Sequence, residues 1–160
     1  MSSIKNNIKG KKLTAPKGAK IGVIKSEYNS KITDSLLKSC VQELKKSGVG
    51  EKNINVTEVP GAYEIPYACQ KVVLTKKCDA IITLGAIIKG ETPHFDFIAN
   101  SCSIGIMDVS LKMNIPIIFG VLTTNNIQQA KARIKGGKIG DKGVEAAQAA
   151  IKMLNNLSLK

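Results

Sequence analysis

The chain has 160 residues, of which 43% are hydrophobic, and a formal net charge of +12 at pH 7. This length is enough for one domain with a hydrophobic core, and no apolar run approaches the roughly 18 to 20 residues that span a bilayer. The first residues lack the apolar stretch of a secretory signal, so we expect a cytoplasmic protein that does not act at a membrane.

The positive charge raises the question of whether the chain binds nucleic acid. Its lysines are spread along the sequence, only 4% of the residues are aromatic, and no zinc-finger or RNP-like pattern occurs, so we expect no nucleic-acid partner. The first 20 residues contain six lysines and no acidic residue. We interpret residues 1–19 as a basic arm, mobile or docked on a partner, ahead of a single domain of residues 20–160.

After Lys20, apolar runs rich in β-branched residues alternate with helical patterns. The runs are "KIGVIK" (20–25), "INVTEV" (54–59), "DAIITLGAII" (79–88) and "IPIIFGVL" (115–122), typical of parallel strands buried on both faces. Helices are predicted over 32–46, 62–74 and 94–113, followed by a broken helical tail at 125–133 and 142–154. This order predicts an α/β fold, a three-layer α/β/α sandwich around a four-stranded parallel sheet.

The four cysteines are Cys40, Cys69, Cys78 and Cys102, and their spacing matches no metal site or redox motif. With only one histidine in the chain, a zinc site would be hard to assemble. We therefore expect buried thiols and no bound metal.

Ligands of open parallel sheets bind outside the carboxyl ends of the strands, which draws attention to the loops at 26–29, 60–64, 89–94 and 123–126. Tyr28 and Tyr63 lie in the first two loops, and Phe119 lies in the fourth predicted strand. Aromatic faces could stack on a planar ligand, although core packing is the commoner role of any one aromatic residue.

The third loop, "KGETPH", carries the strongest indication of a site. Gly90 allows close approach of the backbone, and Glu91 and Thr92 precede a helix whose first N–H groups lack intrahelical partners, which is a favourable place for a phosphate. Thr92 followed by Pro93 is equally consistent with a plain helix cap. His94 lies within one turn and can exchange protons near neutral pH, or it can be structural.

Four segments in order resemble the motifs of the 6,7-dimethyl-8-ribityllumazine synthase family: "VPGAYEIP" (59–66), "LGAIIKGETPHFDFI" (84–98), "IPIIFGVLTTNNIQQAKAR" (115–133) and "GDKGVEAA" (140–147). The resemblance covers about residues 20–154. It implies a flavodoxin-like fold and a transferase of riboflavin biosynthesis that needs no cofactor and no metal. The implied substrates are 5-amino-6-(D-ribitylamino)uracil and 3,4-dihydroxy-2-butanone 4-phosphate, which condense with loss of phosphate and water.

The resemblance also implies roles for individual residues. Tyr28 stacks on the pyrimidine and His94 transfers protons. The pyrimidine and ribityl chain are bound by Ala62, Tyr63, Glu64, Ala86, Ile87, Ile88 and Phe119. The phosphate is bound by Glu91, Thr92, Arg133 and Lys142. Of these residues, Phe119, Arg133 and Lys142 correspond to positions that the adjacent subunit donates.

Members of this family form pentamers with active sites at the subunit interfaces, and some close into shells of sixty subunits. The "GGKIG" turn (136–140) resembles that of shell formers, and we expect a homo-oligomer and favour a shell. This chain departs from the commoner pattern at Glu27 and Tyr28, at Lys89, at Asp141, and by one extra residue within 133–143. The alternative is a non-catalytic flavin- or lumazine-binding protein, or a structural shell protein; retention of His94 and Arg133 favours catalysis.

Overall fold

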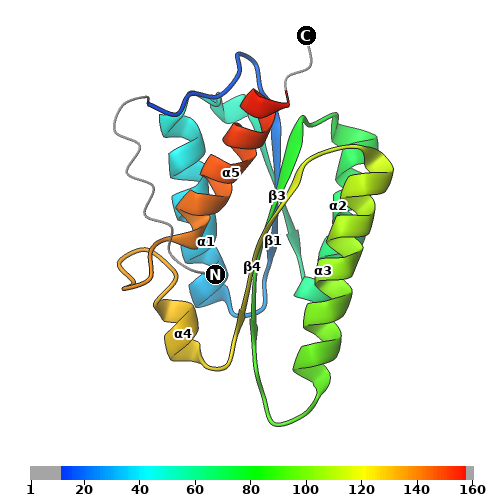
Figure 1. Cartoon of the computed structure of the whole chain (residues 1–160), viewed down its shortest axis with the longest axis vertical. Helices are drawn as coiled ribbons and strands as arrows, with labels where there is room; N and C mark the ends of the chain where they lie inside the picture. Colours follow the sequence, from blue (N-terminus) through cyan, green and yellow to red (C-terminus); the bar gives the residue numbers. More distant parts are fainter. Residues whose placement is uncertain (1–11, 158–160) are drawn as a thin grey trace.

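The computed structural model describes residues 12–157, which form a parallel sheet with helices on both faces (Figure 1). The strands are β1 (Ile21–Ser26), β2 (Ile54–Val59), β3 (Ala80–Ile88) and β4 (Ile117–Thr124). The helices are α1 (Ser30–Lys46), α2 (Ile65–Lys76), α3 (His94–Met113), α4 (Ile127–Lys131) and α5 (Lys142–Asn156), with 3₁₀ turns η1 (Glu51–Asn53) and η2 (Ala62–Glu64). The strand order is β2-β1-β3-β4, which confirms the predicted three-layer, flavodoxin-like class.

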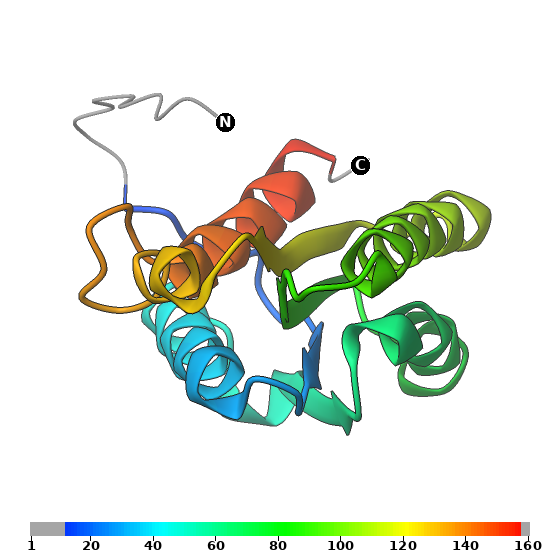
Figure 2. The same cartoon turned by 90° about the horizontal axis from the view of Figure 1, so that it is seen from below.

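Strand β3 lies between β1 and β4, and every residue from Ala80 to Ile87 is buried. Because successive side chains of a strand point to opposite faces, β3 contributes to two hydrophobic cores. Ile82 belongs to the core under α1 and α5, while Ile81 belongs to the core under α2 and α3. Figure 2 shows these helix pairs on opposite sides of the sheet.

The predicted boundaries hold within a few residues, and two differences have a physical cause. The predicted helix at 62–74 is divided into η2 and α2, because Pro66 lies in the first turn of α2, where its missing N–H is not needed. The expectation that all four strands are buried on both faces is wrong for β2 and β4. They form the two edges of the sheet, and Val56 and Phe119 are 42% and 44% exposed.

The N-terminal arm predicted at 1–19 is described only from residue 12 onward; residues 1–11 lie outside the described part of the chain. Within the described part, the Ala15 N–H donates to the carbonyl of Ser47, and the Asn155 amide donates to the carbonyl of Thr14. Residues 12–19 thus lie against the end of α1 and the end of α5. Across 12–157, no helix is long and apolar enough to cross a membrane.

Three of the four cysteines are buried free thiols, as predicted: Cys40, Cys69 and Cys102; Cys78 is half-buried. Burial raises the pKa of Cys40, Cys69 and Cys102 to about 12 in each case. These three thiols are therefore protonated at neutral pH, which makes them poor nucleophiles.

Two glycines allow the helices of each layer to approach closely. A Cβ added at Gly143 of α5 would lie 2.3 Å from the carbonyl oxygen of Leu36 in α1. A Cβ added at Gly105 of α3 would lie 2.8 Å from the Pro66 ring of α2. A side chain at either position would push the paired helices apart.

We expect Gly143→Ala to lower the free energy of unfolding by about 1–3 kcal/mol, the usual cost of overpacking, because the obstructing group is backbone and cannot rotate away. Urea denaturation at one fixed protein concentration measures this loss. Gly50→Ala is the matched control, since Gly50 has an ordinary φ of −64° and the atom nearest its added Cβ would be 3.8 Å away. Equal stability of the two variants would contradict the proposed close contact.

Candidate active site

A cleft of about 800 Å³ opens at the carboxyl ends of the strands, between the β1–α1 loop, η2 and the start of α3. Its lining comprises Tyr28, Asn29, Gly61, Ala62, Tyr63, Glu64, Ala86, Ile87, Ile88, Gly90, Thr92, His94, Phe95 and Ile98. A second groove, of about 830 Å³, contains residues 16–19 and 114–116, and none of the predicted site residues lines it. We place the site in the first cleft because it contains the only histidine and residues from three of the four predicted loops.

The β1–α1 loop presents Tyr28, which is 74% exposed. Its backbone is tied to the end of β2, because the N–H groups of Glu27 and Tyr28 donate to the carbonyls of Val59 and Pro60 at 2.8 and 3.1 Å. Asn29 follows in the left-handed region with a φ of 58°, and its side-chain amide donates to the Ala86 carbonyl at 2.7 Å. The loop is therefore hydrogen-bonded to the end of β2 and to β3, the two strands that flank β1.

Asn29 was missed as a site residue, although its position before a predicted helix was a usable signal. Asparagine tolerates positive φ better than other non-glycine residues, so it often marks a sharp turn into a helix. The remaining unpredicted lining residues include Phe95 and Ile98, which pack against the core under α2 and α3. Their apolar character gave no reason to separate them from other core residues.

The β2–α2 loop forms a tight turn that lines the cleft. The Glu64 carboxylate accepts the Gly61 N–H at 2.9 Å, and the Glu64 N–H donates to the Gly61 carbonyl at 3.3 Å. Tyr63 lies within this turn and is 60% exposed. A turn fixed in this way can offer backbone groups to a polar ligand at little further cost in conformational entropy.

The third loop leads into α3, which begins at His94 as predicted. Pro93, and not Thr92, occupies the N-cap position, which corrects the alternative of a Thr92 cap with Pro93 in the first turn. The Thr92 hydroxyl instead accepts a long, 3.4 Å hydrogen bond from the His94 N–H. Thr92 and His94 both line the cleft and are exposed, so an anion could reach this helix N-terminus. Glu91 is exposed but does not line the cleft.

Three predicted residues lie away from this cleft. Phe119 is on the edge strand β4, Arg133 follows α4, and Lys142 opens α5. Figure 2 shows α4 and α5 across the sheet from α3. These residues do not join His94 within one chain.

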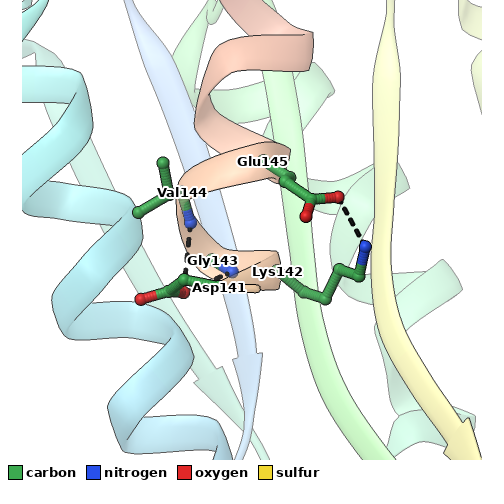
Figure 3. Close-up of polar contacts among 5 residues, drawn as sticks. All are labelled: Asp141, Lys142, Gly143, Val144 and Glu145. Atoms are coloured by element: carbon green, nitrogen blue, oxygen red, sulfur yellow. Dashed lines mark hydrogen bonds and ion pairs between the residues drawn. The ribbon is translucent and has the colours of Figure 1, made fainter. Parts of the chain in front are cut away.

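Arg133 and Lys142 nevertheless lie close to each other. The Lys142 N–H donates to the Arg133 carbonyl at 2.9 Å, so the segment between them, which carries the extra residue, closes on itself. The Arg133 guanidinium donates to the Gln129 carbonyl at 2.9 Å, and the Lys142 ammonium pairs with Glu145 at 2.6 Å (Figure 3). Both side chains are partly exposed, and these contacts leave further donors on each for a ligand.

Asp141 caps α5 in the place where asparagine is commoner. One carboxylate oxygen accepts the N–H groups of Gly143 and Val144 at 3.0 and 3.3 Å (Figure 3). An aspartate and an asparagine are about equally good N-caps, so the substitution leaves the start of α5 unchanged. The position of Lys142 depends on this cap.

Comparison with known proteins gives two findings. The family model described as 6,7-dimethyl-8-ribityllumazine synthase matches residues 18–158. The chain is also 47% identical, over 137 residues, to a 6,7-dimethyl-8-ribityllumazine synthase of Protochlamydia amoebophila (strain UWE25); the match covers 86% of this chain and 79% of the relative. The family-model match includes every site residue predicted above, since all of them lie between residues 18 and 158.

The cap of α5 can be tested separately from any activity. Asp141→Ala should lower the free energy of unfolding by about 0.5–2 kcal/mol, the usual cost of losing an N-cap, whereas Asp141→Asn should stay within about 0.5 kcal/mol of the parent. Thermal and urea denaturation of the three proteins measure these differences. If the alanine variant were as stable as the parent, the two hydrogen bonds of Asp141 would contribute nothing to stability.

Proposed function

The chain belongs to the 6,7-dimethyl-8-ribityllumazine synthase family, and we propose that it catalyses that condensation in riboflavin biosynthesis. In this reaction 5-amino-6-(D-ribitylamino)uracil and 3,4-dihydroxy-2-butanone 4-phosphate give 6,7-dimethyl-8-ribityllumazine, phosphate and water. The observation that carries the proposal is the cleft in which Tyr28, the turn at residues 61–64 and His94 come together. A non-catalytic binding or shell protein is not favoured, because the residues that the chemistry needs are present.

The cleft suits a flat, polar substrate next to a phosphate. The exposed ring of Tyr28 offers a face for the pyrimidine, and the turn at Ala62, Tyr63 and Glu64 together with the end of β3 offers backbone groups for the ribityl chain. The N-terminus of α3, beside Thr92, offers partial positive charge for the phosphate of the second substrate.

The chemistry needs proton transfer and stabilisation of a leaving group. Attack of the 5-amino group on the ketone gives a carbinolamine, and loss of water from it gives an imine. His94 can donate and accept the protons of these steps. Elimination of phosphate then places charge on the leaving group, which the fork of Arg133 can stabilise by paired hydrogen bonds. Tautomerisation leaves a ketone, and attack of the ribitylamino nitrogen on it, with loss of a second water, closes the ring. Holding both substrates in register supplies a large part of the rate.

Because Arg133, Lys142 and Phe119 lie away from the cleft of their own chain, we propose that they complete the cleft of an adjacent subunit. The exposed face of α3 supports an assembly. Phe97, Ile104, Met107 and Leu111 lie along it, and each is at least 60% exposed. An apolar stripe of this kind on a helix marks a surface that a partner covers, and we assign it to a second copy of the chain in a pentamer.

We favour a shell of sixty subunits over a free pentamer, because the "GGKIG" turn between α4 and α5 resembles that of shell formers. The cytoplasmic location remains a prediction of the sequence.

The direct test of function is to mix the purified protein with both substrates and follow the absorbance of the lumazine product. No product above the uncatalysed rate would reject the proposed activity.

His94→Ala should slow turnover at least tenfold and by as much as about 10⁴, the range for loss of an acid–base group, while slow condensation by proximity continues. Steady-state kinetics with both substrates measure the loss, and circular dichroism and light scattering check that fold and assembly are retained. His94→Gln, which keeps a polar side chain without the titration, should be equally slow. Rates within twofold of the parent would make His94 a structural residue.

Arg133→Lys should weaken binding of the butanone phosphate far more than binding of the pyrimidine. Lysine keeps the positive charge but loses the planar fork that grips phosphate with two hydrogen bonds. The two Michaelis constants, measured separately, show the difference. A matched change, Lys131→Arg on the neighbouring α4, should leave both constants unchanged. Equal shifts of the two constants in Arg133→Lys would remove Arg133 from the phosphate site.

The assembly can be measured by light scattering. Five copies of a 17.1 kDa chain give about 85 kDa and sixty give about 1 MDa. Ile104→Glu places a charge in the middle of the α3 stripe and should dissociate the assembly, because burying an unpaired carboxylate is costly. Lys38→Glu, on an exposed site of α1, is the control for a change of charge. A parent protein that is monomeric would reject the assembly, and a pure pentamer would reject the shell.

A further inference from the structure

Lys25, the second-last residue of β1, is a buried cation that the proposed reaction does not use. Only 4% of the residue is exposed. Its ammonium contacts the carboxylates of Asp34 and Glu58 at 2.5 and 3.1 Å. Burial lowers the pKa of Lys25, but the hydrogen bonds and charges of Asp34 and Glu58 outweigh burial and raise its pKa above the ordinary value. Lys25 is therefore charged at neutral pH.

The two partners of Lys25 lie on the segments that flank the cleft loops. Asp34 is in the first turns of α1, which starts directly after Tyr28 and Asn29. Glu58 pairs with Lys25 across the β1–β2 ladder and stands just before Val59 and Pro60, the two residues whose carbonyls hold the Tyr28 loop. One cation thus joins the beginning of the loop, the helix after it, and the strand that leads to the second cleft loop.

Tyr28 depends on this backbone for its position. The residue is 74% exposed, so few contacts of the ring itself restrain it. Tyr63 lies in the loop after Glu58 and is 60% exposed. Any shift of β1 against β2 or α1 would therefore change the position of one aromatic ring relative to the other. Lys25 is placed to oppose both shifts.

We propose that Lys25 is a positioning residue for the pyrimidine site, acting through Asp34 and Glu58 to hold the Tyr28 loop in register with the Tyr63 turn. This inference rests on the proposed function for the identity of the ligand. The residues that determine affinity for the pyrimidine would then include a buried charge network that does not line the cleft.

Fold stability alone does not account for the network. Replacing a buried ion pair by apolar residues of similar size is often neutral or stabilising, so the charges of this network are not required for folding. The carboxylates of Asp34 and Glu58 are 62% and 50% exposed, so neither would be left buried and unpaired if the lysine were replaced. Lys25→Met should therefore fold.

The test compares Lys25→Met and Lys25→Arg with the parent enzyme. Lys25→Met should raise the Michaelis constant for 5-amino-6-(D-ribitylamino)uracil about fivefold or more, with kcat and the constant for the butanone phosphate within about twofold, the pattern of lost ground-state binding. Lys25→Arg, which keeps the charge and its hydrogen bonds, should recover most of the affinity. The matched control is Lys45→Met, which breaks the exposed pair between Lys45 of α1 and Glu51 of η1 and should leave both Michaelis constants and kcat unchanged.

Hydrogen exchange provides a readout that does not need turnover. In Lys25→Met the amides of Glu27 and Tyr28 should exchange at least about fivefold faster than in the parent, while those of β3 should not change. If Lys25→Met fails to fold, Glu58→Gln and Asp34→Asn, which keep the lysine, should each raise the same Michaelis constant by a smaller factor.

The outcomes separate the two proposals. A parent enzyme that makes no lumazine rejects the proposed function, and exchange at Glu27 and Tyr28 then still decides whether Lys25 holds the loop. If the parent is active and the Michaelis constant of Lys25→Met for the pyrimidine stays within twofold of the parent value, the positioning role is overturned and the proposed function stands. A fall in kcat alone has the same consequence. Failure of Lys25→Arg to recover affinity also overturns it.

Discussion

The burial of β3 on both faces is the constraint from which the rest of this structure follows. A parallel strand with another strand on each side and a helix layer on each face has no exposed surface, which is why Ala80–Ile87 are apolar or small, with Thr83 bonded through its hydroxyl to the Ile118 carbonyl. Both hydrophobic cores include side chains from this strand. Its carboxyl end is also the floor of the cleft, through Ala86, Ile87 and Ile88. Stability and the site thus depend on the same nine residues.

The cleft is built by loops that hold one another. The β1–α1 loop is bonded to the end of β2 through Glu27 and Tyr28, and to β3 through Asn29. Because these contacts use backbone groups and one short side chain, they leave the rings of Tyr28 and Tyr63 free to face a ligand. The ion pair of Lys25 with Glu58 joins β1 to β2, two residues before Glu27. Rigid strands below and exposed side chains above are the usual division between scaffold and site.

The remaining predicted residues lie in the part of the chain after β3. Phe119, Arg133 and Lys142 lie on β4 and the α4–α5 region, and a single subunit cannot bring them into its own cleft. In a cyclic ring each interface joins two different surfaces, so one copy can supply the cleft and the next can supply the cations. The apolar stripe on α3 begins at Phe97, three residues after His94. The surface that would form the ring therefore adjoins the surface that would form the site.

The sequence by itself determined the class of fold, because short apolar runs rich in β-branched residues alternate with helical stretches, the order typical of a parallel sheet covered by helices. It also determined the start of α3 at His94 and most of the cleft, since the carboxyl ends of parallel strands must meet at one edge. Only the tertiary structure decided that β2 and β4 are edge strands, because strand order is not encoded in a local pattern. The same holds for the Asn29–Ala86 hydrogen bond and the contacts of Lys25 with Asp34 and Glu58, since each joins residues whose proximity follows from the packing of separate elements.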